Sequence, residues 1–258
     1  MVRTHRRGGF SLIELGIVIL LLAVLGGLMA VALVESRTGG EPGVDPAIVT
    51  VREVGSRTQS QHNLHMLVLA VHDYASATNN TIPPGFDKTG MFNNRGGGTM
   101  FYYLLPYVEG DAIYSNLLPD KVDTPFKGYI APGDPTHDGK AAFTSYAINP
   151  NMSDPTILPG SFQRGTSNTV AFVERAAVCQ DGGRRYANTR DWDFDATGGP
   201  REFEPPQGNR YATAFSKASC QIGMMDGSVR GVRIDQPSFP IACLLKQGNP
   251  PQPLGPDW

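Results

Sequence analysis

The segment that most constrains this chain is an uncharged, mostly apolar run of twenty residues, 15–34. A helix of that length rises about 30 Å, which matches the hydrocarbon thickness of a bilayer. Arg3, Arg6 and Arg7 precede the run, and basic residues tend to stay on the cytoplasmic side of a membrane. The sequence therefore predicts a single-pass inner-membrane protein. Its N-terminus would be cytoplasmic, and its C-terminal region would be periplasmic or extracellular.

Glu14, directly before the run, separates the possible interpretations. A plain transmembrane anchor does not account for it, because a carboxylate in an apolar helix costs about 2.5–3.5 kcal/mol. A cleaved secretory signal is a second interpretation, because Ala-Val-Ala at 30–32 is similar to a cleavage site. Glu14 fits poorly there too, and the run is long for such a signal.

Residues 6–14 read Arg-Arg-Gly-Gly-Phe-Ser-Leu-Ile-Glu, and this segment resembles a type IV prepilin signal. The resemblance implies that a prepilin peptidase cuts between Gly9 and Phe10 and methylates the new N-terminus. Glu14 would then lie one helical turn from the α-amine of Phe10. A buried carboxylate needs a partner. We therefore expect Glu14 to pair with the α-amine of a neighbouring pilin-like subunit within the membrane lipid. This pair would set the axial register between subunits that pack side by side.

Four regions follow from these features. They are a leader at 1–9, a transmembrane helix at 10–36, a linker at 37–46 and an extracytoplasmic domain at 47–258. The linker is inferred from two prolines and three glycines in ten positions, which break a helix. Pilins usually run one continuous helix into the head, so the linker favours the alternative of a non-polymerising binding module, held by an anchor or released by signal cleavage.

The outer region has helical signals first and strand signals later. A helix is predicted over 47–78, because apolar residues recur at i, i+3 or i+4 and i+7 from Leu64 to Val71. Residues 100–118 are predicted to form short helical turns around a proline. Short strands are predicted at 126–131, 143–148, 169–174, 212–215, 220–225 and 228–234. The expected fold is α+β and pilin-like, with the second helix packed on an antiparallel sheet. Long loops include 181–209, and the tail is 250–258.

A tight hairpin is predicted between the last two strands. Asp226-Gly227 lies between them, and Asp-Gly favours a type I′ turn in which both central residues have positive φ. We therefore interpret Asp226 and Gly227 as a structural turn.

Several short motifs occur in the order typical of a large bacterial family with a prepilin-type N-terminus and an outer domain of unknown function, number 1559. They are Asn63-Leu64 with 69–74, 83–85, 104–109, 131–135, 144–147, 165–169 with Glu174-Arg175, and 226–230. Residues 46–234 resemble that family, which implies a pilin-like domain but no substrate. Two departures stand out. Ala131 replaces a frequent cysteine, and Ser216 replaces a histidine ten residues before the Asp-Gly, so chemistry proposed for that histidine cannot operate here.

Three histidines, His62, His65 and His72, fall on roughly one face of the predicted helix. Imidazoles commonly bind zinc, but ten helical residues separate His62 from His72 by about 15 Å, too far for one ion. We therefore expect polar structural positions, with His72 in a hydrogen-bonded role.

Alternating carboxylates at Asp191, Asp193 and Asp195 are similar to the start of a calcium loop. The following glycine is replaced by Ala196 and the distal glutamate is missing, which excludes an EF-hand. Two interpretations follow, a weak calcium site at these three residues and a solvated acidic loop. No other cofactor is predicted.

Composition and motifs exclude several function classes. A net charge of −2 argues against nucleic-acid binding, and three widely spaced cysteines form no disulfide framework. The sequence holds no GxSxG, HExxH or P-loop motif. Residues 165–169 are interpreted as a turn entering a strand. The prediction is a pseudopilin-type structural protein of a type II secretion or type IV pilus-like assembly, and not an enzyme.

Overall fold

The structure, a computed structural model, describes residues 46–88, 96–152, 156–179, 182–190, 192–204, 210–216, 219–246, 253–255 and 258, with the backbone alone for 46–50. The chain divides into two units, Met1–Val51 and Arg52–Trp258, and the second holds the sheets. The predicted leader, transmembrane helix and nearly all of the predicted linker lie outside the described residues. Within these ranges, the structure contains no helix with the length and hydropathy of a membrane span.

The longest element among the described residues is helix α2, Pro46–Ala77, close to the predicted 47–78. Proline suits the first helical turn, where no N–H partner is needed. The helix ends where Asn79 and Asn80 take left-handed φ values of 54° and 60°, and the N–H of Asn80 donates to the carbonyl of Ala75 at 2.8 Å. The predicted apolar face is confirmed, because these side chains are buried: Leu64, Leu67, Val68 and Val71.

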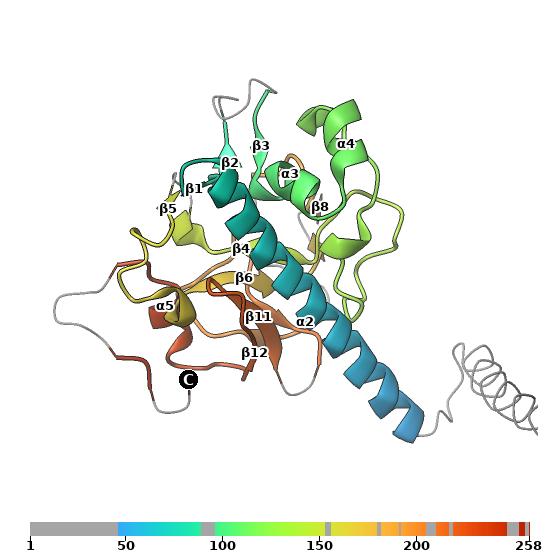
Figure 1. The fold of residues 1–258 in the computed structure, drawn as a ribbon. Coiled ribbons are helices and arrows are strands. Elements are labelled where there is room, and N and C mark those ends of the chain that lie inside the picture. The colour runs from blue at the N-terminus through green and yellow to red at the C-terminus, as the bar shows by residue number, and fades with distance from the viewer. Residues whose placement is uncertain are drawn as a thin grey trace, which may run out of the picture. The chain divides into compact units, whose positions relative to one another are not determined.

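A four-stranded antiparallel sheet forms the centre of the fold. Its strands are β4 (Tyr146–Ile148), β6 (Val170–Glu174), β11 (Cys220–Met224) and β12 (Val229–Val232), in the order β12-β11-β6-β4. Helix α2 crosses one face of this sheet (Figure 1). The combination of helices with mainly antiparallel sheets confirms the predicted α+β class.

Strand β11 has two different faces, as the period of two in a strand requires. Cys220, Ile222 and Met224 join the apolar cluster that includes α5 (Phe239–Ala242). Gly223 faces α2 instead, and a Cβ there would lie 3.1 Å from Val68 Cγ2. Glycine at this position therefore allows the helix to lie close to the sheet.

Short helical turns follow α2, as predicted for 100–118. They are α3 (Met100–Leu104), η1 (Leu105–Tyr107) and α4 (Asp111–Asn116). Further 3-10 turns are η2 (Pro119–Lys121), η3 (Lys127–Tyr129), η4 (Pro150–Met152) and η5 (Thr166–Asn168). The small sheets pair β1 (Thr81–Ile82) with β5 (Thr156–Ile157), β2 (Phe86–Asp87) with β3 (Gly98–Thr99), β7 (Val178–Cys179) with β8 (Gly182–Gly183), and β9 (Arg201–Glu202) in parallel with β10 (Thr213–Ala214).

The predicted strand at 126–131 is wrong. This segment contains the turn η3, in which the N–H of Tyr129 donates to the carbonyl of Phe126 at 3.0 Å. The two aromatic residues are three positions apart, which is the period of a 3-10 helix and puts both on one side.

The other predicted strands exist but are shorter than predicted at one or both ends. The expected loop at 181–209 also contains β8 and β9.

Candidate functional site

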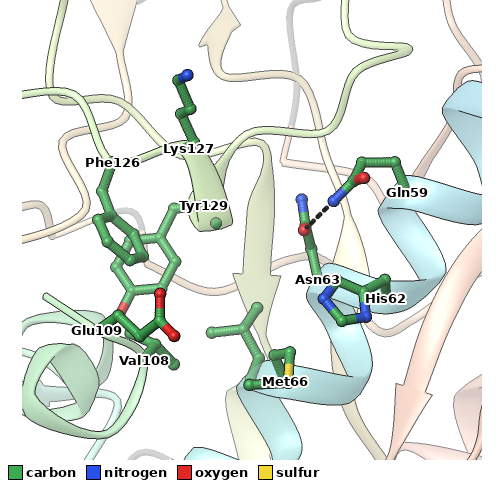
Figure 2. Close-up of a pocket in the computed structure, with 11 residues that line it drawn as sticks. Gln59, His62, Asn63, Met66, Val108, Glu109, Phe126, Lys127 and Tyr129 are labelled. Carbon is green, nitrogen blue, oxygen red and sulfur yellow. Dashed lines mark hydrogen bonds between the residues drawn. The ribbon is translucent and has the colours of Figure 1, made fainter. Parts of the chain in front are cut away.

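A pocket of about 310 Å³ lies between helix α2 and two later turns of the chain. Figure 2 shows Gln59, His62, Asn63 and Met66 on one side, with Val108, Glu109, Phe126 and Tyr129 on the other. This volume is at the small end of the range of about 300–1,000 Å³ that is typical of small-molecule sites.

The wall formed by α2 is fixed by hydrogen bonds at Asn63. Gln59, Asn63 and Met66 follow one another at helical spacing, so they lie on one face. Asn63 is 6% exposed, and its Nδ2 donates to the carbonyl of Ile130 at 3.0 Å and to the hydroxyl of Tyr146 at 3.2 Å. Its Oδ1 accepts from Gln59 Nε2 at 3.0 Å. These bonds hold both amides in position at the pocket.

Glu109 on the opposite wall has a left-handed backbone, with φ of 63°. The carbonyl of Leu105 accepts from the N–H of Val108 at 3.2 Å and from that of Gly110 at 2.8 Å. This is the hydrogen-bond pattern of a helix end at which glycine usually takes the left-handed position. A non-glycine residue there costs about 1–2 kcal/mol. Glu109 therefore carries a backbone penalty at this helix end.

Two aromatic rings form the rest of that wall. The centroids of Phe126 and Tyr129 are 4.8 Å apart, with an angle of 66° between the ring planes. The hydroxyl of Tyr129 donates to the carbonyl of Phe101 at 2.7 Å, and burial raises the pKa of Tyr129 well above its ordinary value. A Cβ at Gly128 would lie 2.8 Å from Phe126 Cε1, so glycine leaves the space that the Phe126 ring occupies.

Some polar groups of the pocket are not used by the fold. Within the described part of the chain, neither the His62 ring nor the Glu109 carboxylate takes part in a hydrogen bond or ion pair, and both residues are exposed. The Lys127 side chain extends away from the other labelled residues (Figure 2). The pocket thus places solvent-exposed polar groups beside apolar side chains.

A buried polar network lies behind this wall and joins α2 to the central sheet. Ser60 Oγ donates to Glu174 Oε1 at 2.5 Å and is 3.1 Å from the Tyr146 hydroxyl. The N–H of Gln221 donates to Glu174 Oε2 at 2.7 Å. Tyr146 also contacts Asn63, so the network reaches the pocket through that residue.

The Glu174 carboxyl has an altered pKa. Burial raises the pKa of Glu174 from its ordinary 4.5 to about 7, although the Ser60 and Gln221 hydrogen bonds oppose the rise. The charge of Asp134 adds to the rise and that of Arg57 opposes it. Glu174 is therefore largely protonated in the folded domain below neutral pH.

The three histidines predicted to be structural lie at two places. His62 lines the pocket. His65 Nδ1 lies 2.7 Å from the carbonyl of Gly227, and His72 Nε2 lies 2.8 Å from that of Met225. Because a carbonyl only accepts, both ring nitrogens donate. The hydrogen-bonded role predicted for His72 is confirmed.

The acidic loop shows separate partners for its carboxylates. Asp193 Oδ1 pairs with Arg210 at 3.2 Å, whereas Asp195 Oδ1 accepts from the N–H and hydroxyl of Thr197 at 2.9 and 2.6 Å. Asp191 lies outside the described residues. Among the residues that are described, no group of three or more His, Cys, Asp or Glu side chains could hold a metal ion. The weak calcium site stays a prediction.

The Asp226-Gly227 hairpin is present, but its predicted type is wrong. Gly227 alone of the two has a positive φ, 90°, and its N–H donates to the carbonyl of Met224 at 3.0 Å. This matches a type I turn followed by a left-handed residue, the common form of a three-residue hairpin loop. Asp226 Oδ1 accepts from the N–H and hydroxyl of Ser228 at 2.9 and 2.6 Å. These two hydrogen bonds favour the type I turn at Asp226 over the predicted type I′ turn.

The turn predicted at 165–169 is present as η5 before β6, with Gly165 at a φ of 86°.

The processing and assembly residues Gly9, Phe10 and Glu14 lie outside the described residues.

Sequence reasoning missed the pocket residues other than His62, and it missed the role of Glu174. Two local signals existed. Glu109 precedes Gly110 after a proline-containing turn, where a helix end is expected. Glu174 ends a buried apolar strand, where a carboxylate requires a partner.

The comparisons with known proteins give one match. Residues 50–122 match the model of a family described as "Protein of unknown function (DUF1559)", which confirms the predicted resemblance over that part of the chain. The matched residues include the α2 wall of the pocket and Glu109, but not the segment 126–129. No curated protein matches the chain, and no solved structure matches it.

Proposed function

We propose that this chain is a membrane-anchored, pilin-like structural protein of the pseudopilin type. A prepilin peptidase would cut between Gly9 and Phe10, and residues 10–36 would remain in the inner membrane. The outer domain would face the periplasm or the cell exterior. The protein would join other pilin-like subunits in a type II secretion or type IV pilus-like assembly, and the proposal includes no catalytic step.

The observation that carries this proposal is the arrangement of α2. It is a 32-residue helix that buries one face against an antiparallel sheet, which is the arrangement expected of a pilin-like head. The family match over 50–122 also supports the proposal.

The N-terminal residue of the protein from native membranes tests this function. We expect Phe10, N-methylated, by intact mass and N-terminal sequencing. A mature protein that begins at Met1, or at Leu33 after the Ala-Val-Ala segment, would contradict the pilin assignment.

A second function is a non-polymerising binding module, and the pocket is the observation that favours it. Glu109 has a left-handed backbone at the edge of the pocket, and such strain clusters at ligand sites.

A further inference from the structure

The free polar groups of the pocket define the kind of ligand that it can bind. The Glu109 carboxylate only accepts hydrogen bonds, whereas His62 and Gln59 can both donate and accept. An anionic ligand would lie beside the Glu109 charge, and like charges repel. A neutral ligand with several hydroxyl groups matches the whole set, because each hydroxyl both donates and accepts.

The apolar part of the pocket adds a second requirement. The Phe126 ring and the Met66 and Val108 side chains line it, and these side chains need an apolar surface on the ligand. The C–H face of a pyranose ring provides such a surface, with hydroxyl groups around its edge. The pocket volume of about 310 Å³ suits one or two sugar rings. A longer oligosaccharide would not fit inside the pocket.

We propose that this pocket binds a neutral carbohydrate, with Glu109 and His62 holding hydroxyl groups and Phe126 packing on the C–H face of the ring. The proposal rests on the second function, the binding module. It does not depend on whether the chain also assembles with other subunits.

The test uses the full-length chain in a detergent without a sugar head group, so that the detergent cannot compete. Methionine methyl groups are labelled with ¹³C, and neutral mono- and disaccharides are titrated while the NMR spectrum is recorded. Met66 lines the pocket, whereas Met224 is buried in the other apolar cluster. We expect the Met66 methyl signal to shift with a saturable sugar concentration and the Met224 signal to stay unchanged. A panel of free amino acids is titrated in the same way.

Glu109→Gly provides the sharpest variant. Glycine accepts the left-handed backbone without strain, so the melting temperature should stay the same or rise. Loss of the carboxylate should weaken sugar binding about ten-fold or more, because it removes charge-assisted hydrogen bonds. Glu202→Gln, an exposed carboxylate on β9, serves as the matched control and should bind as the wild type does.

Each outcome decides the proposal. A sugar-dependent Met66 shift that Glu109→Gly abolishes and Glu202→Gln retains supports it. A Met66 shift with amino acids but not with sugars overturns the carbohydrate assignment and keeps the binding module. No Met66 shift with either panel overturns both. A clear fall in the melting temperature of Glu109→Gly would show that Glu109 serves the fold instead.

Discussion

Protonation of Glu174 is predicted to make the stability of the outer domain depend on pH. Burial raises the pKa of this carboxyl from 4.5 to about 7. Between these two values the folded state keeps the proton, while the unfolded state has lost it. The folded state is therefore favoured at low pH, and this contribution is lost as the pH rises through about 7.

The size of the effect follows from the pKa difference. One pKa unit corresponds to about 1.4 kcal/mol, so the full rise corresponds to roughly 3 kcal/mol between about pH 4 and pH 8. Glu174→Gln should remove this dependence, because a glutamine is neutral at every pH. Its oxygen can still accept from the N–H of Gln221, and its amide can donate to Ser60 Oγ. We expect the variant to be more stable than the wild type above about pH 7, by up to that amount.

Urea denaturation at a series of pH values measures the effect. The difference in free energy of unfolding between wild type and Glu174→Gln isolates Glu174 from the other titrating groups, including the nearby Asp134 and Arg57. Glu202→Gln on the exposed β9 strand is the control and should follow the wild-type curve. A difference that is the same at all pH values would refute the reasoning, because Glu174 would then be ionised equally in both states.

Three further predictions concern particular positions. Gly227→Val should destabilise the domain by about 1–2 kcal/mol in thermal melting, because Gly227 has a φ of 90° and valine disfavours a left-handed backbone; an unchanged melting temperature would contradict this. Gly223→Val should cost about 1–3 kcal/mol by the same measurement, since a Cβ would lie 3.1 Å from Val68 Cγ2 and the helix would be pushed from the sheet. Glu14→Ala should leave membrane insertion intact but abolish crosslinked multimers, because an unpaired α-amine at Phe10 costs about 3–5 kcal/mol; equal ladders from both proteins would favour the binding module.

The local pattern of the sequence determined those elements in which one face is apolar and the other is polar. The apolar spacing from Leu64 to Val71 predicted the buried face of α2, since a helix with one apolar side must pack that side. The Asp226-Gly227 pair predicted the hairpin that joins β11 and β12, because Asp-Gly between two strand signals favours a tight turn. The type of that hairpin was missed, because the backbone of Asp226 is set by its bonds to Ser228 and not by intrinsic preference alone.

The tertiary structure alone decided the pocket and the buried network. Helix α2, the turn at Glu109 and the segment 126–129 are far apart in the chain, and a periodic pattern reports which face is buried but not which segment covers it. For the same reason Ser60 could not be paired with Glu174 beforehand, although a buried carboxylate always demands a partner. The sequence alone determined that some residues must be covered or paired, because that follows from their own chemistry. Only the packing of distant segments decided their partners, because those contacts depend on how the whole domain closes.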